Sequence, residues 1–382
     1  MIIFGFILVY VFLICLFLVG YNRVPPFTLE ACNKNQSFSI IIPFRNEEAQ
    51  LPALLESIHR LDYPVSQVEI LMVNDGSSDC SVQVIQNYIQ KNQLSHIHIL
   101  ENRRQSGSPK KDAIKTAISV SKFSWVITTD ADCILPSKWL KVLDNFIEKK
   151  RSNMVAGPLA LIEKTNTLSF LHAFEVLDVH SLLGVTIGAF GLGNPLMANG
   201  AHLAYRKEVF YQVKGFEGND HVASGDDLFL LEKFLDHDAK AVHYLKSKDV
   251  LVRTSAQENW SGFMNQRKRW AAKASGFKSN FAKAVGIIVL LGNLLMVIAY
   301  GMLLYPLFDQ TYRFHVAFIG IAIFLKYLID GLLILRAQRF TGSHLKFFWY
   351  PLVALCYPIM TLTIALLAFT TSYTWKGRRF TQ

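Results

Sequence analysis

The sequence predicts an α/β domain with a mostly parallel sheet, held between one N-terminal and about three C-terminal transmembrane helices. Of the 382 residues, 51% are hydrophobic, which fits a purely soluble globular protein poorly. Long apolar runs gather at the two ends of the chain and are long enough to cross a bilayer. The middle alternates short β-rich runs with amphipathic stretches, as a parallel sheet with covering helices requires.

The composition changes sharply along the chain, and these changes mark four parts. We expect an N-terminal transmembrane anchor at 1–22, a catalytic-sized domain at 37–257, an amphipathic interfacial helix at 258–280 and transmembrane helices at 284–373. The first segment has no basic residue before it and no small-residue cleavage pattern after it, so we expect an uncleaved anchor. The protein is therefore expected to be an integral protein of the cell membrane.

Basic residues indicate the orientation of the middle domain. Arg23 and Lys34 follow the first apolar segment, so the positive-inside rule places the domain in the cytosol. Three apolar spans come later, at Ala284–Phe308, His315–Leu335 and Phe347–Tyr373. Three crossings would leave the basic tail on the far side, against that rule. Either one span is re-entrant or the tail is an exception.

The formal net charge of +10 does not indicate a nucleic-acid-binding protein. The five cysteines show no paired spacing, which argues against a disulfide framework or a zinc site. Anionic lipid headgroups and a bound diphosphate explain the basic residues better, so we expect a membrane and no nucleic acid as partners. The basic residues beside apolar segments are Lys268, Arg269, Lys376, Arg378 and Arg379.

From Ser37 onward, strand-like runs and helix-like stretches alternate. In a sheet of this kind, ligands bind outside the carboxyl ends of the strands, so polar residues there carry functional weight. Farther on, Ser181–Tyr205 is apolar, rich in glycine and broken by Pro195. We interpret it as buried or membrane-proximal backbone, with sheet core as the alternative. The expected strands are 38–43, 68–73, 96–100 and 124–129, and the expected helices are 47–60, 79–92, 110–121 and 136–150.

Two carboxylates, Asp130 and Asp132, follow the fourth expected strand. Mg²⁺ and Mn²⁺ take one or two protein carboxylates and complete their shell with phosphates and water. The pair therefore predicts a metal site that holds a diphosphate and stabilises its charge as it leaves. The competing interpretation is a solvated turn that caps the helix after Pro136.

Three further carboxylates stand at places that favour chemistry. Asp75 ends the second expected strand, where it can accept hydrogen bonds from a base or a ribose, although the small residues after it also suit a helix cap. Asp226 and Asp227 precede an apolar stretch at 228–235. One of them can act as a general base that removes a hydroxyl proton. An acidic helix N-terminus is the alternative.

Gln266, Arg269 and Trp270 lie in an amphipathic stretch, Trp260–Phe277, just before the C-terminal spans. The planar fork of Arg269 suits a diphosphate, and Trp270 offers a flat apolar face to a sugar. The alternative is an interfacial helix whose Arg, Lys and Trp residues lie among lipid headgroups.

Taken in this order, these motifs resemble those of the family 2 glycosyltransferases with a GT-A fold, in the membrane-bound branch of ceramide glucosyltransferases and cellulose, chitin and hyaluronan synthases. The resemblance covers about residues 37–275 and rests on four spaced motifs. It implies a GT-A nucleotide-sugar-binding domain and a metal-dependent transferase of the hexosyltransferase type that uses Mg²⁺ or Mn²⁺. It also implies metal ligands at Asp130 and Asp132 and a donor site lined by Pro43, Asn46, Glu47, Asp75, Lys110, Asp130, Gln266, Arg269 and Trp270.

The same resemblance implies an inverting displacement with Asp227 as the catalytic base and Asp226 beside it. The family usually has Glu at the place of Asp226, so the choice within the pair stays open. Arg267 fits the stricter motif of polymerising synthases, but four candidate spans are few for an enclosed channel. We therefore favour transfer of one sugar from a nucleotide sugar, with UDP as the family's usual carrier, to a membrane lipid or lipid-linked acceptor.

Two other functions remain as alternatives. One is a small processive polysaccharide synthase, with a glycan acceptor. The other is a non-catalytic membrane module that binds a nucleotide sugar without turnover. A sugar nucleotidyltransferase would not explain the spans or the helix that bears Trp270. Within the middle C-terminal span, Lys326 and Asp330 are interpreted as a packing pair, and handling of an acceptor headgroup is the alternative.

Overall fold

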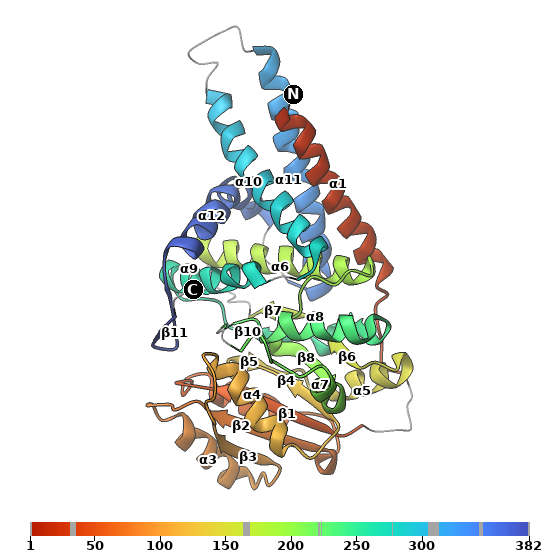
Figure 1. Cartoon of the computed structure of the whole chain (residues 1–382), viewed down its shortest axis with the longest axis vertical. Coiled ribbons are helices and arrows are strands. Elements are labelled where there is room, and N and C mark those ends of the chain that lie inside the picture. Colours follow the sequence, from red (N-terminus) through yellow and green to blue (C-terminus); the bar gives the residue numbers. More distant parts are fainter. Residues whose placement is uncertain are drawn as a thin grey trace.

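The computed structural model of the chain describes residues 2–30, 36–162, 169–220, 222, 224–276, 278–304, 313–343 and 347–380. Lys34 and residues 305–308 of the first C-terminal span lie outside the described residues. Figure 1 shows an α/β domain at one end of the molecule and a helical bundle at the other. The bundle holds α1 (Ile2–Arg23), α10 (Asn280–Leu304) and α11 (Arg313–Thr341). Between the two parts lie α6 (Phe170–Gly191), α9 (Trp260–Ala271) and α12 (Tyr350–Thr370).

The α/β domain is built on a seven-stranded sheet in the order β3-β2-β1-β4-β8-β6-β9. Only β8 runs antiparallel to its neighbours in this sheet, so the prediction of a mostly parallel sheet is confirmed. All eight strands and helices predicted within residues 38–150 are present. The strands are β1 (Phe38–Phe44), β2 (Val68–Asn74), β3 (Ile97–Glu101), β4 (Trp125–Thr128), β6 (Met154–Ala156), β8 (Leu203–Arg206) and β9 (Val242–Tyr244). The helices of this region are α2 (Leu51–His59), α3 (Ser81–Asn92), α4 (Pro109–Val120) and α5 (Trp139–Lys150).

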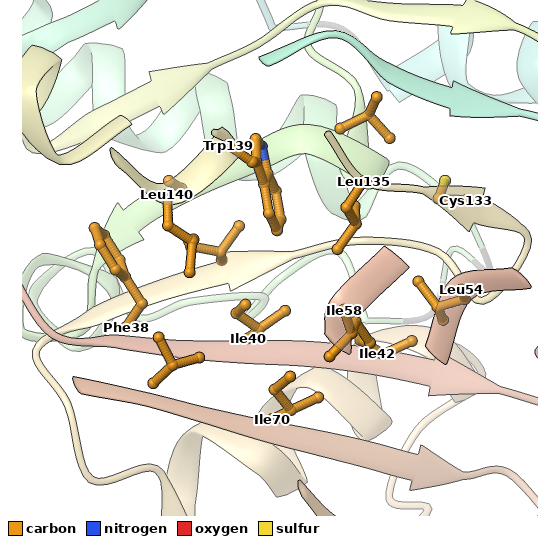
Figure 2. Packing of buried hydrophobic residues seen from close by; sticks show 14 of the residues in the cluster. Phe38, Ile40, Ile42, Leu54, Ile58, Ile70, Cys133, Leu135, Trp139 and Leu140 are labelled. Atoms are coloured by element: carbon orange, nitrogen blue, oxygen red, sulfur yellow. The ribbon is translucent and has the colours of Figure 1, made fainter. Parts of the chain in front are cut away.

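Both faces of the sheet are buried, which explains why β1 is apolar along nearly its whole length. Phe38, Ile40 and Ile42 point to one face and pack with residues of α2 and α5 (Figure 2). Ile41 points to the other face, with residues of α4 and of α8 (Asp226–Asp238). That second core also takes in Tyr21 of α1, so the membrane helices and the sheet share one hydrophobic contact region.

For the segment Ser181–Tyr205, the alternative interpretation as sheet core is wrong for all but its last residues. Its first part continues α6 to Gly191, and only Leu203–Arg206 joins the sheet, as β8. Helix α6 runs across the molecule between the bundle and the sheet (Figure 1). It is mostly buried although it carries polar residues, because neighbouring elements cover it on several sides. The interpretation as buried, membrane-proximal backbone therefore fits α6.

Glycines allow α1 and α6 to cross at close range. A Cβ atom added to Gly191 would meet the backbone oxygen of Gly20 at 1.8 Å, and one added to Gly188 would meet that of Phe17 at 2.5 Å. Real side chains cannot occupy such positions, so small residues at the crossing are a condition of this contact. Close by, the Lys246 Nζ donates to the backbone oxygens of Tyr21 and Val24, which fastens the α/β domain to the end of α1.

Among the described residues, five helices are long and apolar enough to cross a membrane: Ile3–Arg23, Phe170–Gly191, Asn280–Leu303, Val316–Thr341 and Phe347–Ala368. The last of these does not lead away from the α/β domain. Trp349, before α12, contacts Phe170 at the start of α6, with ring centroids 5.9 Å apart. After α12 the chain forms a hairpin of β11 (Tyr373–Trp375) and β12 (Arg378–Phe380) that contacts the α/β domain. Both ends of α12 therefore lie on the domain side, which favours the re-entrant alternative over an exception to the charge rule.

We predict that the C-terminus and the α/β domain lie on the same side of the membrane, because α12 returns to the domain. In sealed vesicles with one orientation, a membrane-impermeant maleimide should label an added C-terminal cysteine and the exposed Cys80 of the domain together, or neither. Each cysteine is tested in a background without the other cysteines. Labelling of only one of the two would contradict this topology.

Candidate active site

The carboxyl ends of β1, β2 and β4 meet at one edge of the sheet, because β1 pairs in parallel with both neighbours. A cavity of about 350 Å³ lies there. Eight predicted site residues line it, and Arg45, Lys376 and Arg378 join them. Asn46, Trp270, Asp226 and Asp227 are not among the lining residues. The eight are Pro43, Glu47, Asp75, Lys110, Asp130, Asp132, Gln266 and Arg269.

Asp130 and Asp132 lie side by side at the cavity, just past β4. The Asp132 Oδ2 accepts a hydrogen bond from the Thr254 hydroxyl at 3.0 Å, which orients this carboxylate. Burial and the nearby charge of Asp130 raise the pKa of Asp132, which disfavours the charged form of this carboxylate. A divalent cation bound beside it would favour the charged form.

The carboxylates of Asp130 and Asp132 fit Mg²⁺ or Mn²⁺ if other ligands complete the shell of the ion. Within the part of the chain that the structure describes, no group of three His, Cys, Asp or Glu residues is placed to hold a metal ion by itself. Asp130 and Asp132 offer two carboxylates beside an open cavity, and these ions accept one or two protein carboxylates when substrate phosphates complete the shell. The site therefore suits a metal that binds together with a phosphate-bearing ligand.

Lys110 joins the carboxylate pair to the second acidic motif. Its Nζ lies 2.7 Å from Asp130 Oδ1 and 3.1 Å from Asp226 Oδ2. Burial alone would lower the pKa of Lys110, but Asp130 and Asp226 raise it above its usual value. Burial likewise would raise the pKa of Asp226, but Lys110 and Lys273 lower it below its usual range. Asp226 is therefore held as a carboxylate next to the cavity.

Asp227 faces a different partner. Its carboxylate pairs with Lys273 at 3.1 Å and accepts from the backbone N–H of Gly200 and of Leu228. The contact with Leu228 lies in the first turn of α8, so the alternative of an acid at a helix N-terminus also applies. The side chain of Asp227 is 15% exposed and that of Asp226 is 9% exposed, so Asp227 is the more accessible carboxylate.

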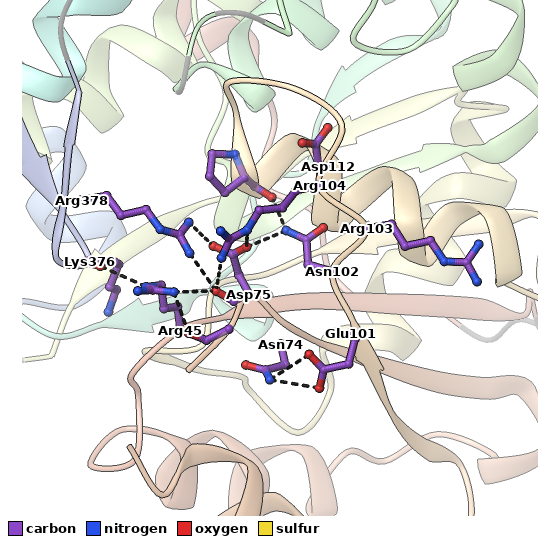
Figure 3. A network of polar contacts seen from close by, with 12 residues as sticks. Arg45, Asn74, Asp75, Glu101, Asn102, Arg103, Arg104, Asp112, Lys376 and Arg378 are labelled. Atoms are coloured by element: carbon purple, nitrogen blue, oxygen red, sulfur yellow. Dashed lines mark hydrogen bonds and ion pairs between the residues drawn. The ribbon is translucent and has the colours of Figure 1, made fainter. Parts of the chain in front are cut away.

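Asp75 is surrounded by donors from three parts of the chain (Figure 3). Its carboxylate accepts from Arg104 Nε at 2.8 Å, from Asn102 Nδ2 at 2.7 Å and from Arg378 Nη1 at 2.5 Å. Arg45 donates to the backbone oxygen of the same residue. Asp75, which we predicted to accept hydrogen bonds from a ribose or base, is thus paired with protein cations in this structure.

The C-terminal hairpin supplies two of the cations at the cavity. Lys376 Nζ pairs with Glu47, and Arg378 pairs with Asp75. Burial raises the pKa of Glu47, and the charge of Lys376 opposes that shift. The turn between the strands has Lys376 and Gly377 with φ of 49° and 74°, the geometry that a two-residue hairpin turn needs.

Sequence reasoning missed this role of the hairpin. The turn residue Gly377 between β-forming residues is a hairpin signal, but nothing in it shows which distant surface the hairpin contacts. Arg378 and Asp75 are 303 positions apart. Arg104 and Asn102 were also missed, since they lie in a loop without a recognisable motif, and Arg45 was passed over between the predicted residues Pro43 and Asn46.

The motif on α9 and the residue Asn46 are only partly at the cavity. Gln266 and Arg269, three residues apart on α9, face the cavity, whereas Trp270 stacks on the guanidinium of Arg267. Asn46 joins the loops after β1 and β2, since its Oδ1 accepts from the backbone N–H of Ser78. Asn46 and Trp270 thus lie at the border of the site and do not line the cavity.

The charges around the cavity suit an anionic ligand that brings a metal. Its lining has four carboxylates, those of Glu47, Asp75, Asp130 and Asp132. Five cations accompany them: Arg45, Lys110, Arg269, Lys376 and Arg378. A diphosphate could exchange with the carboxylates as the partner of these cations, and a divalent metal held by Asp130 and Asp132 would neutralise the charge of that pair. Fold and site define an α/β domain whose cavity suits a phosphate-bearing ligand together with a divalent metal.

Comparison with known proteins identifies the family. Residues 39–213 match the model of glycosyl transferase family 2. The chain carries a family 2 glycosyltransferase domain of the GT-A type, here joined to several long apolar helices. The prediction of the family and of its fold is therefore confirmed.

Two curated relatives and one solved structure are similar over different lengths. The poly(ribitol-phosphate) β-N-acetylglucosaminyltransferase TarS of Staphylococcus aureus is 29% identical over 118 residues, which cover 31% of this chain and 20% of the relative. The poly-β-1,6-N-acetyl-D-glucosamine synthase of Staphylococcus epidermidis is 20% identical over 284 residues, or 70% of this chain and 65% of the relative. The mannosyltransferase PcManGT of Pyrobaculum calidifontis, solved with GDP-Man and Mn²⁺, is 16% identical. Its TM-score of 0.53, with 96% of this chain and 94% of that chain covered, shows a shared fold.

We predict that Asp75→Asn frees the C-terminal hairpin, because it removes the charge that holds Arg378. Loss of a charge-assisted hydrogen bond should raise the rate of trypsin cleavage after Lys376 and Arg378 about tenfold. Mass spectrometry of the truncated chain measures that rate. The matched control is Asp62→Asn, which breaks an exposed ion pair with Lys141 and should leave the rate unchanged. Equal cleavage in wild type and Asp75→Asn would show that the ion pair does not hold the hairpin.

Proposed function

We propose that this chain transfers one sugar, with inversion, from a nucleotide-sugar donor to a membrane lipid or lipid-linked acceptor. One observation carries the proposal: the carboxylates Asp130 and Asp132 share a cavity with five cations, and one wall of that cavity is the helix α9 that contacts α12. The cavity can therefore hold a metal and a diphosphate, and it lies next to the helices on the membrane-facing side of the domain.

The donor side of the proposal rests on charge. Asp130 and Asp132 would hold Mg²⁺ or Mn²⁺, which offsets the charge of a departing nucleoside diphosphate when it is bound. Lys110, Arg269 and Arg378 reach the same cavity and can pair with phosphate oxygens. PcManGT, which shares the fold, was solved with GDP-Man and Mn²⁺, and this supports a donor of the same chemical class. UDP remains the carrier that we expect.

The proposal of a lipid acceptor rests on the contacts of α9 with the cavity and with the membrane-proximal helices. Gly262, Asn265 and Gln266 of this helix line the cavity, and other residues of the helix pack on α6 and α12. A lipid acceptor can thus approach along the membrane-proximal helices and place its hydroxyl beside the donor. Arg23 at the end of α1 and Arg339 in the last turn of α11 lie on the domain side, which supports a cytosolic domain.

For the chemical step, we propose Asp227 as the general base and Asp226 as a charge partner of Lys110. The base must accept a proton from the acceptor hydroxyl, so the more accessible carboxylate suits the role better. Asp226 shares Lys110 with Asp130 and so connects the base region with the metal site. The hydroxyl attacks the anomeric carbon in one displacement, and the cations of the cavity stabilise the departing diphosphate.

A processive polysaccharide synthase is the second candidate. The similarity to poly-β-1,6-N-acetyl-D-glucosamine synthase over 70% of this chain favours it. Within the bundle, however, Lys326 pairs with Asp330 at 2.7 Å, and Tyr10 donates to the same carboxylate at 2.9 Å. These groups hold α1 against α11, which supports the packing interpretation of the pair. Single transfer remains the first proposal, because the few candidate spans do not favour an enclosed channel for a growing chain.

We expect nucleoside diphosphate release that depends on metal. The full chain in lipid nanodiscs is given a panel of UDP- and GDP-sugars with Mn²⁺, with Mg²⁺ or with EDTA. Asp132→Asn should lower turnover at least about 100-fold, which corresponds to about 3 kcal/mol of lost transition-state stabilisation. Asp249→Asn, a change at an exposed carboxylate of the same domain, is the control and should be fully active. Turnover that survives EDTA would contradict the role of the metal.

The base is tested with Asp227→Asn and Asp226→Asn. If Asp227 accepts the proton, its replacement lowers kcat about 100- to 10,000-fold while the Kd for UDP or GDP with Mn²⁺ stays near the wild-type value. Asp226→Asn should instead weaken nucleotide binding, because it frees Lys110 to pair fully with Asp130. The opposite pattern would move the base to Asp226. Tight binding without turnover in the wild type would favour the non-catalytic module.

A further inference from the structure

Helix α9 presents its motif on two faces. Gln266 and Arg269 are three residues apart and line the cavity. Arg267 and Trp270 are also three residues apart and contact one another outside the cavity lining, where Arg267 pairs with Asp178 of α6. The two faces meet at one contact, because Arg267 Nη1 donates to the side-chain oxygen of Gln266. The cavity is thus physically connected to the membrane-proximal side of α9.

Arg267 is held in place from several directions. Only 6% of it is exposed. Its Nε and Nη2 lie 2.7 Å and 2.6 Å from the Asp178 Oδ2 on α6. Its guanidinium lies against the rings of Phe263 and Trp270, 4.6 Å and 4.2 Å from their centroids. A planar cation stacked and paired in this way has little rotational freedom.

Helix α12 closes the same network. The Tyr357 hydroxyl donates to the Asp178 Oδ1 at 3.0 Å, so both oxygens of this buried carboxylate are used. Arg267 is therefore fixed by residues of two helices that lie outside the cavity. Removing one member of such a buried network affects the geometry of the others.

The orientation of Gln266 decides what it can offer to a ligand. An amide side chain has one end that accepts and one that donates hydrogen bonds. Since Arg267 engages the oxygen of Gln266, the Nε2 end remains for the cavity. Two N–H donors suit a diphosphate, whereas an oxygen at the same place would repel it.

We propose that Arg267 is a positioning residue that turns the Gln266 amide so that its N–H donors face the bound diphosphate. Asp178 and Tyr357 set the position of Arg267 in turn. This inference rests on the proposed function for the nature of the ligand. It assigns to Arg267 an effect on the donor site, although this residue does not line the cavity.

The test is a double-mutant cycle of Arg267→Lys and Gln266→Ala in the full chain in nanodiscs. Lysine keeps a cation for Asp178 but lacks the second arm that reaches Gln266. Measured quantities are the Kd for UDP and for GDP with Mn²⁺, the KM and kcat with the active donor, and the thermal midpoint. Each single variant should weaken nucleotide binding about tenfold, the usual effect of one charge-assisted hydrogen bond. The double variant should also lose about tenfold, because both changes remove the same contact.

Two further variants keep the outcome clear. Lys268→Gln removes the neighbouring cation and should leave the Kd unchanged. Tyr357→Phe removes one hydroxyl, and its smaller loss of affinity should vanish in the Gln266→Ala background even if Arg267→Lys does not fold. An unchanged Kd in Arg267→Lys, or a loss of about 100-fold in the double variant, would overturn the positioning role alone. Absence of nucleotide binding and of turnover in the wild type would overturn the proposed function and this inference with it.

Discussion

Four carboxylates collected at one edge of a parallel sheet set the main constraint on this protein. Asp75 follows β2 and Asp130 follows β4, the strands on either side of β1, and Asp132 and Glu47 lie close by, so the topology brings their charges together. Such a cluster is unfavourable unless cations lie among it. The chain meets this need with residues from many segments, including Lys110 of α4 and Arg378 near the C-terminus. In the proposed function the same cations bind the diphosphate, so one arrangement would serve both stability and binding.

Helix α6 is the element that joins this site to the membrane part. It crosses α1 at Gly188 and Gly191, where the backbones touch, and it presents Asp178 to the motif-bearing helix α9. Its polar residues are paired with groups of α9, α11 and α12. A helix that looks like a membrane span by composition therefore serves as a platform between the bundle and the sheet. These contacts fix the position of the α/β domain relative to the helical bundle.

The C-terminal hairpin indicates that the last apolar helix, α12, does not lead the chain to the far side of the membrane. Lys376 and Arg378 contact Glu47 and Asp75, so α12 has to end beside the α/β domain. Its start lies on the same side, because Trp349 contacts Phe170 of α6. The basic tail then lies on the same side as Arg23, in agreement with the charge rule that three crossings would have broken. Membrane topology and the composition of the cavity are thus linked through two ion pairs.

What the sequence determined by itself was local. The alternation of apolar runs and amphipathic stretches predicted all eight elements of residues 38–150, because strand and helix periods are properties of neighbouring residues. Asp130, Asp132 and Asp75 were found for the same reason, since they stand at the ends of recognisable strands. Gln266 and Arg269 were found as a motif, and the structure places both at the cavity.

Only the tertiary structure decided which distant groups meet. It brought Arg378 to Asp75, separated Trp270 from the cavity lining, and used Arg267 to join α9 to Asp178. It also made a helix of Ser181–Gly191, where the apolar composition alone was compatible with sheet core. Long-range contacts such as these depend on chain packing and on the balance of buried charge, and neither leaves a periodic signal in the order of residues.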